Sequence, residues 1–247
     1  MMARDSIDLW TWRLDADPGS AALLTEPERA RALRFVFPVD SARYVAARSG
    51  LRRVLGGYRG GAPAAIRLAE GPHGKPALAD EPYLQFNLSH CEDVAFLAVT
   101  TAGEVGVDIE ALRPFEAGGV ERFFSRQEQN ILAAAPQAER MRAFFQCWTR
   151  KEAVLKALGN GLARPLDSFD VDMLSCDCPR VLRFADEGED PAAWRLWHVE
   201  PAPGFVGAVA IRAAGSISLR LRGAPFSDEA PPCANQGSAH GEVHRSI

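Results

Sequence analysis

The sequence predicts an α+β protein whose strands form mostly antiparallel sheets. Three segments repeat apolar residues every three or four positions, the period of an amphipathic helix: Leu23–Arg34, Asp40–Leu55 and Phe144–Leu158. Shorter segments alternate apolar and polar residues or are rich in β-branched residues, as strands are: 7–13, 83–88, 94–100, 105–110, 181–184, 194–199 and 205–211. The strand sequences VAFLAVT (94–100) and FVGAVAI (205–211) are faintly similar. Helices and strands of this kind together predict the mixed class.

The helix limits are predicted by capping and stop signals. The first helix starts at Thr25, with Pro27 in its first turn and Glu28 at the capping-box position. We expect the second helix to end at Gly56-Gly57 and the third at Gly159, because glycine adopts left-handed conformations at low cost. The pattern Ser125-x-x-Glu128 is a second capping box, for a helix running towards Ala135 that Pro136 interrupts.

Composition limits the class of protein. The chain has 247 residues and a net charge of −4, which argues against a general nucleic-acid binder. Its five scattered cysteines fit free thiols in a reducing compartment. No secretion signal and no membrane-length apolar run is visible, so we expect a cytoplasmic protein that does not enter a membrane.

Carboxylates in two separate segments indicate a cation site. Asp108 and Glu110 are two apart on a predicted strand and therefore share a face, while Glu152 and Lys156 are four apart on a predicted helix. The helical pair alone fits an ordinary surface ion pair. Three carboxylates together, however, suit a hard divalent cation such as magnesium, which also takes phosphate oxygens and water as ligands.

Basic groups are scattered along the N-terminal part. The segment Gly71–Pro76 resembles a phosphate-binding loop only superficially, because Pro76 follows Lys75 and no helix begins there. It is either a surface turn or a turn that holds one lysine near an anion. His90 follows Ser89 near a predicted turn, and a phosphate ligand would favour its protonated form.

Taken together, three separated motifs resemble the Sfp-type phosphopantetheinyl transferases. The matching stretches are Gly74-Lys75-Pro76 with Asn87-Leu88-Ser89-His90, Gly106-Val107-Asp108-Ile109-Glu110, and Trp148-Thr149-Arg150-Lys151-Glu152 with Lys156. Phe123-Phe124-Ser125 and Gly159-x-Gly161-Leu162 also match. The resemblance covers roughly residues 24–211. It implies a pseudo-twofold arrangement of two similar α/β halves, 1–111 and 112–222, and we expect 223–247 to be a mostly disordered tail.

The resemblance also implies a reaction and a set of roles. Phosphopantetheine would pass from coenzyme A to a serine of an apo acyl or peptidyl carrier protein, releasing adenosine 3′,5′-bisphosphate. Mg²⁺, or Mn²⁺ in its place, would be held by Asp108, Glu110 and Glu152. Glu152, or a water that it orients, would act as the base, and Lys156 would stabilise or protonate the leaving oxygen.

Coenzyme A would contact a larger set of residues, and the enzyme is expected to be a monomer. The set is Arg31, Arg48, Gly74, Lys75, Pro76, Ser89, His90, Asp108, Glu152 and Lys156. Arg43 competes with Arg48 for its role. Two other classes remain open: a non-catalytic coenzyme A binding module, and a metal-dependent phosphoesterase that releases phosphopantetheine to water.

Overall fold

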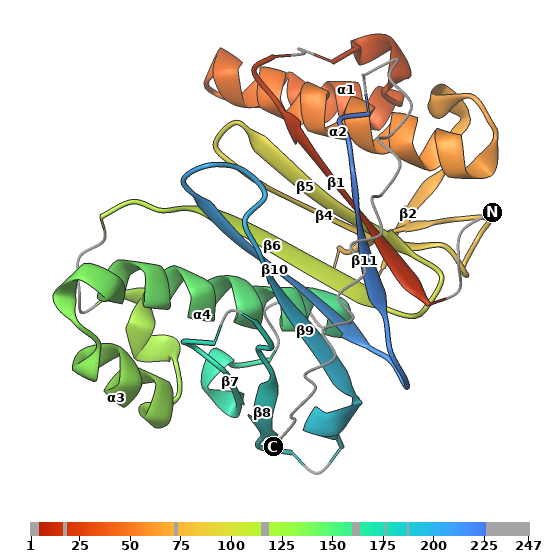
Figure 1. Cartoon of the computed structure of the whole chain (residues 1–247). Coiled ribbons are helices and arrows are strands. Elements are labelled where there is room, and N and C mark those ends of the chain that lie inside the picture. Colours follow the sequence, from red (N-terminus) through yellow and green to blue (C-terminus); the bar gives the residue numbers. More distant parts are fainter. Residues whose placement is uncertain are drawn as a thin grey trace, which may run out of the picture.

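The computed structural model describes residues 5–16, 19–71, 74–114, 119–159, 164–175, 177–186 and 188–225 (Figure 1). Its α-helices are α1 (Glu26–Ala32), α2 (Pro38–Arg59), α3 (Arg126–Ala134) and α4 (Gln137–Leu158). Its strands are β1 (Ser6–Arg13), β2 (Leu68–Glu70), β3 (Pro76–Leu78), β4 (Gln85–Cys91), β5 (Val94–Thr100), β6 (Val105–Ala111), β7 (Phe169–Val171), β8 (Val181–Phe184), β9 (Trp194–Val199), β10 (Phe205–Arg212) and β11 (Ser218–Arg222).

Two main sheets form the centre of the molecule. One has the strand order β11-β1-β5-β4 and the other β6-β10-β9, while β2–β3 and β7–β8 are separate two-stranded pairs. Only the β1–β11 pairing is parallel among the described strands. In Figure 1, α1 and α2 lie on the first sheet and α4 lies along the second. The predicted α+β class with mostly antiparallel sheets is therefore confirmed.

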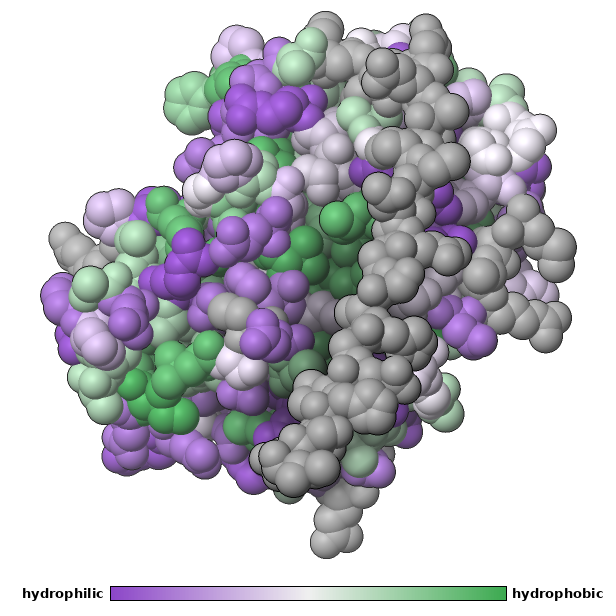
Figure 2. All heavy atoms as spheres, in the orientation of Figure 1, coloured by the Kyte–Doolittle hydropathy of each residue, from purple (hydrophilic) through white to green (hydrophobic). Residues whose placement is uncertain are grey.

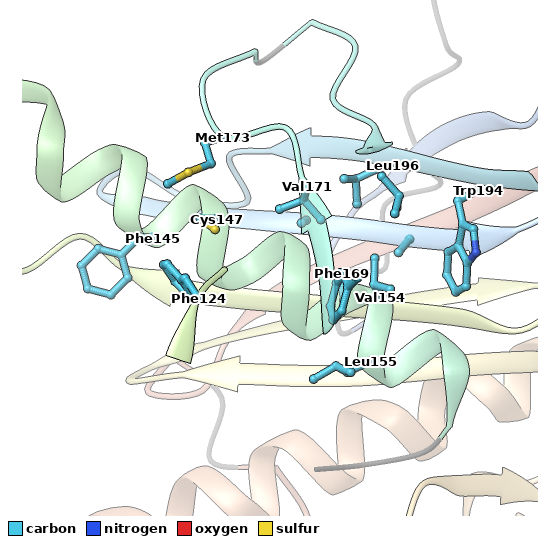
Figure 3. Close-up of a cluster of buried hydrophobic side chains, with 14 of the residues drawn as sticks. Phe124, Phe145, Cys147, Val154, Leu155, Phe169, Val171, Met173, Trp194 and Leu196 are labelled. Atoms are coloured by element: carbon cyan, nitrogen blue, oxygen red, sulfur yellow. The ribbon is translucent and has the colours of Figure 1, made fainter. Parts of the chain in front are cut away.

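Side chains point alternately to the two faces of each strand, and the buried ones form three hydrophobic cores. On β6, Val105, Val107 and Ile109 face a core between the two sheets, shared with Ile7 and Leu9 of β1. A second core lies between α2 and the first sheet. A third packs the apolar side of α4 against β7, β9 and β10 (Figure 3). The intervening residues of β1 and β6 consequently face the long helices α2 and α4.

The long helices exceed their predicted limits. The predicted end of the second helix at Gly56-Gly57 is wrong, since α2 continues to Arg59 and ends at Gly60, whose φ is 65°. Gly56 instead allows the backbone at Gly61 to pack closely against α2, because a Cβ on Gly56 would lie 2.9 Å from the carbonyl oxygen of Gly61. α4 begins at Gln137, seven residues earlier than predicted, with Pro136 as its N-cap. Proline suits a helix start because it lacks only an N–H that the helix would leave unpaired.

The strand β11 was not predicted. It returns the chain to the N-terminal sheet, where residues 218–222 pair with residues 6–10. We call α1, α2 and β1–β5 the N-terminal half, which β11 joins, and β6–β10 with α3 and α4 the C-terminal half. The predicted boundary after residue 111 stays a prediction, and the predicted tail lies outside the described residues from 226 onward.

The face drawn in Figure 2 carries separate hydrophobic patches within a largely hydrophilic surface. None of the described helices is long and apolar enough to cross a bilayer.

Candidate active site

A glycine allows the helix α4 to approach the strand β6 closely. A Cβ on Gly106 would lie 2.0 Å from the carbonyl oxygen of Ala153 and 2.4 Å from the amide nitrogen of Ala157. Any other residue would therefore push α4 away from β6. The close crossing brings Glu152 and Lys156 of α4 over the face of β6 that carries the carboxylates.

Asp108 is the centre of the polar cluster. Its side chain is 8% exposed, and its Oδ1 accepts hydrogen bonds from Ser89 Oγ (2.9 Å) and Lys156 Nζ (2.6 Å). Lys156 Nζ also donates to Ser89 Oγ at 3.1 Å, which closes a triangle of three groups. The buried Oδ2 of Asp108 has no hydrogen-bond partner among the described residues. An unpaired buried carboxylate oxygen is costly and is available to a ligand.

The negative charge of Asp108 acts on the other two predicted metal ligands, Glu110 and Glu152. Burial, followed by the charge of Asp108, raises the pKa of Glu110. Burial and the charges of Asp108 and Glu110 likewise raise the pKa of Glu152, which Lys156 opposes. Glu110 also contacts Arg113 at 3.2 Å and accepts a hydrogen bond from the Cys91 thiol at 3.5 Å. Three mutually repelling carboxylates are an arrangement that a bound cation would relieve.

The donor set therefore fits a hard divalent cation chemically, through its carboxylate oxygens and the unpaired Asp108 Oδ2. In the described part of the chain, however, no three His, Cys, Asp or Glu side chains already converge as a metal-holding group. The carboxylates would have to close around a cation.

The strand β4 supplies the N-terminal wall of the site. Asn87 Oδ1 accepts a hydrogen bond from the backbone N–H of Val107 at 2.8 Å, which joins β4 to β6. This clamp was not predicted, although Asn87 belongs to the Asn-Leu-Ser-His motif. The next polar side chain, Ser89, then reaches Asp108, and the exposed His90 follows it.

His90 lies in a basic environment. Although its surface is exposed, the protein atoms packed around His90 lower its pKa by desolvation, and Lys156 and Arg43 lower the pKa further through their positive charges. Arg43 of α2 therefore lies close enough to act on His90. A group of cations around a histidine fits an anionic ligand, which would reverse the depression of the pKa.

Three further predicted coenzyme A contacts, Gly74, Lys75 and Pro76, lie close to the start of β6 or begin β3. Lys75 follows Gly74, whose φ is 80°, and its Nζ meets Glu104 (2.7 Å) and the carbonyl oxygen of Val105 (3.1 Å) at the start of β6. Pro76 begins β3. Gly74-Lys75-Pro76 therefore brings one lysine to the start of the strand that carries Asp108 and Glu110.

The two predicted arginines have partners within the protein. Arg31 lies over the ring of Tyr44, with 5.4 Å from its Cζ to the ring centroid. Arg48 forms an ion pair with Glu28 at 2.6 Å. A phosphate would have to compete with Glu28 for Arg48 and with Asp40, 3.8 Å away, for Arg43. The Arg43–Asp40 contact is the longer one, and the charge of Arg43 acts on His90, so Arg43 is favoured as the alternative.

A separate polar pocket of about 740 Å³ opens beside the N-terminus of α3. Its lining includes Arg122, Arg126 and Arg183, which is paired with Asp170 at 2.7 Å. Asp167 and Asp170 also line this pocket, so among the described residues Arg122 and Arg126 are its positive side chains that no carboxylate of the lining is shown to pair with.

A buried carboxylate with an unpaired oxygen, two further carboxylates, a lysine and a histidine fit an enzyme that acts on a phosphate ester. Comparison with known proteins agrees. Residues 11–102 match the family model for the N-terminal part of 4′-phosphopantetheinyl transferases, and residues 104–211 match that of the 4′-phosphopantetheinyl transferase superfamily.

Individual relatives carry the same name. The chain is 36% identical over 220 residues to the 4′-phosphopantetheinyl transferase HetI of Nostoc sp., covering 85% of this chain and 90% of that protein. It is 31% identical over 150 residues to the transferase Sfp of Bacillus subtilis, covering 61% of this chain and 66% of Sfp. It is 27% identical over 227 residues to the human L-aminoadipate-semialdehyde dehydrogenase-phosphopantetheinyl transferase, covering 85% and 73% respectively. The chain belongs to the 4′-phosphopantetheinyl transferase superfamily.

Proposed function

We propose that this transferase moves phosphopantetheine from coenzyme A to a serine of an apo acyl or peptidyl carrier protein, with Mg²⁺ held by Asp108, Glu110 and Glu152. The observation that supports it is the Asp108 carboxylate, with one oxygen bound by Ser89 and Lys156 and the other unpaired. When bound, the cation would neutralise the pyrophosphate and the charge developing on the leaving group.

The chain's own residues supply the proton transfers. The carrier serine Oγ forms a bond to the phosphorus that bears the pantetheine, and the bond from that phosphorus to the bridging oxygen breaks. Glu152 accepts the serine proton. Lys156, already within hydrogen-bond distance of Asp108, donates to the leaving phosphate oxygen. The products are the phosphopantetheinylated carrier and adenosine 3′,5′-bisphosphate.

The nucleotide is proposed to lie against the N-terminal half. His90, with Arg43 nearby, would meet a phosphate of coenzyme A. Lys75 at the start of β6 would meet another, releasing Glu104, whose side chain is 58% exposed and can return to water. Arg31 and Arg48 remain proposed contacts, each at the cost of its present partner.

The carrier is proposed to approach from the side of Arg122 and Arg126. These two arginines line the pocket beside α3, and an acidic partner would complement them. Changing both Arg122 and Arg126 to Glu should raise the KM for an acidic carrier several-fold at low salt and leave coenzyme A affinity unchanged. Unchanged carrier kinetics would place the docking surface elsewhere.

We further propose a cytoplasmic monomer. Cys91, Cys147 and Cys178 are free thiols in the described part of the chain, as in a reducing compartment.

The deciding experiment incubates the protein with coenzyme A, Mg²⁺ and a panel of small apo-carriers, and follows the intact mass of each carrier. Transfer adds the phosphopantetheine mass to one serine and forms adenosine 3′,5′-bisphosphate in equal amount. Release of free phosphopantetheine with an unmodified carrier would instead indicate a phosphoesterase. Binding of coenzyme A without either product would indicate a binding module.

A further inference from the structure

The lysine immediately before Glu152 is fully buried. The side chain of Lys151 is 0% exposed, and its Nζ lies 2.8 Å from Glu128 Oε2. It also donates to the carbonyl oxygens of Leu166 (2.7 Å) and Phe169. An ammonium group has three N–H donors, so all three have partners inside the protein. Lys151 is therefore unavailable for a phosphate and serves the protein itself.

Glu128 extends this contact to two further elements. Its Oε2 accepts the backbone N–H of Ser125 at 3.0 Å, which caps α3, and its Oε1 accepts the backbone N–H of Val171 on β7 at 2.9 Å. The ion pair thus links α4 to α3, β7 and the 3₁₀ turn Leu166–Ser168.

Two aromatic rings pack near the Lys151 ammonium group. The Lys151 Nζ lies 4.3 Å from the ring centroid of Phe169 and 6.0 Å from that of Phe124. Figure 3 shows these two rings among the side chains packed against α4. The lysine is enclosed on the side of α4 that faces the C-terminal core.

The direction of Glu152 follows from the rotation of α4 about its axis, to which the apolar side of α4 and the buried Arg150 also contribute. Successive residues on a helix are about 100° apart around the axis, so fixing Lys151 fixes the direction of Glu152. No described residue hydrogen-bonds the Glu152 carboxylate, which experiences Asp108, Lys156 and Glu110 through their charges. On the other side α4 meets Gly106 through Ala153 and Ala157, which sets the distance to β6 but leaves rotation to other contacts.

We propose that Lys151 is a positioning residue. Its buried ion pair with Glu128 fixes the rotation of α4 about its axis and so directs Glu152 towards Asp108 and Glu110. This inference rests on the proposed function, because it assigns Lys151 a role in bringing the carboxylates together around a cation.

The N-terminal half contains a matched control. Arg52 of α2 is also buried. Its Nη2 lies 2.7 Å from Glu28 Oε2, and its Nη1 donates to the carbonyl oxygen of Ile66 at 2.8 Å. Glu28 is likewise the capping-box glutamate of a short helix, at Thr25. The Arg52–Glu28 pair repeats the architecture on a helix that carries none of the three carboxylates.

The test compares two double variants that neutralise each pair. Removing one partner of a buried ion pair leaves an uncompensated charge, so both partners are changed together. Lys151→Met with Glu128→Gln removes the proposed positioning contact, and Arg52→Met with Glu28→Gln is the control. Circular dichroism and thermal melting establish that each is folded, and kinetics are measured equally far below each melting temperature.

Three readouts separate positioning from stability. The Lys151 pair variant should lose at least thirtyfold in kcat. It should also lose about tenfold in Mn²⁺ affinity, measured by electron paramagnetic resonance with coenzyme A present. The KM for coenzyme A should change less than threefold, because the nucleotide side of the site is untouched. The Arg52 pair variant should stay within threefold of wild type in kcat and in Mn²⁺ affinity. Its KM for coenzyme A is left out of the comparison, because Glu28 also pairs with Arg48, a proposed coenzyme A contact.

Equal losses in both variants would overturn the inference, because they would reflect a general softening of the fold. A folded Lys151 pair variant with wild-type kcat and Mn²⁺ affinity would overturn it as well. If that variant fails to fold, Lys151→Leu with Glu128→Gln, which also leaves no buried charge, is judged by the same readouts and limits. Absence of transfer by the wild type would instead contradict the proposed function.

Discussion

Each half has a buried aspartate on the strand face that meets its long helix: Asp8 on β1 and Asp108 on β6. The two aspartates differ in their partners. Asp8 of β1 faces α2, where Tyr58 donates a hydrogen bond to it, and Arg220 and Arg222 of β11 pair with it at 2.6 and 3.2 Å. Asp108 of β6 faces α4 and pairs with Lys156 alone, leaving Oδ2 without a partner in the described residues.

The residues two positions after each aspartate also differ between the halves. Two residues after Asp8 stands Trp10, whose indole N–H donates to the Tyr58 hydroxyl at 3.2 Å. Two residues after Asp108 stands Glu110, a further carboxylate. The N-terminal half thus neutralises its aspartate with protein cations supplied by β11, while the C-terminal half adds negative charge around its own. The aspartate of the C-terminal half becomes part of a candidate cation site because the protein's own cations do not satisfy all of the carboxylate oxygens around it.

The largest expected effect comes from Asp108. Asp108→Asn should reduce transfer by about 1,000-fold with the fold retained, because stabilisation of charge by the cation is worth several kcal/mol. Glu152→Ala should have a comparable effect, and the double variant should be little worse, since residues acting as a unit are non-additive. Steady-state kinetics at saturating Mg²⁺ provide the measurement. Normal turnover by Asp108→Asn would remove Asp108 from the site.

The same change in the N-terminal half should affect stability instead. Asp8→Asn leaves Arg220 and Arg222 without their carboxylate, which should cost about 1–3 kcal/mol. The melting temperature should fall by roughly 2–12 °C for a chain of this size. Transfer per folded molecule should be unchanged well below the transition. A large loss of kcat without loss of stability would show that the two halves are not divided in this way.

The sequence predicted the positions that depend on local periodicity. Asp108 and Glu110 share a strand face, and both glutamates of the two capping boxes occupy the predicted position. It could not predict contacts between distant segments. Ser89 meets Asp108 across two different sheets, and the second role of Glu28, as partner of Arg48 and Arg52, depends on how α1 packs on α2.

The strand β11 was missed for a related reason. Its sequence, SLRLR, is short and includes two arginines among five residues, so its apolar pattern is weak. Arg220 and Arg222 are explained only by the pairing of β11 with β1, which places Asp8 beside them.

A third prediction tests the contribution of the N-terminal half to nucleotide binding. His90→Ala should weaken coenzyme A binding about tenfold, because a hydrogen bond to a charged group is worth roughly 1.5–3 kcal/mol and water replaces part of it. If His90 meets the 3′-phosphate, binding of dephospho-coenzyme A should be unaffected. Calorimetric titration of both ligands measures the ratio. An unchanged preference for coenzyme A would assign His90 to another phosphate or to a structural role.

The smallest expected effect concerns pH, and here the halves should differ in sign. The pKa of Glu152 is raised above its ordinary value of 4.5, by burial first and then by Asp108. The metal-free folded protein therefore binds this proton more tightly than the unfolded chain and loses stability as pH rises from about 4.5 through the folded pKa. Burial also acts to raise the pKa of Glu28, but the Thr25 N–H and Arg48 outweigh it and lower that pKa. The stability from Glu28 is therefore present at neutral pH and is lost as pH falls through its folded pKa.

Two matched substitutions separate these contributions. In metal-free protein at pH 7.5, Glu152→Gln should raise the melting temperature by about 1–3 °C, since removing part of the repulsion is worth less than about 1 kcal/mol. Glu28→Gln should lower it, and both differences should shrink towards pH 4. Mg²⁺ should stabilise the wild type more at pH 7.5 than at pH 5, because the cation binds the ionised carboxylates, and this gain should be lost in Glu152→Gln. Scanning calorimetry of the three proteins with EDTA and with Mg²⁺ measures each difference. If Glu152→Gln instead lowers the melting temperature of the metal-free protein at pH 7.5, the carboxylates of the C-terminal half do not repel one another, and the contrast with the neutralised N-terminal half does not hold.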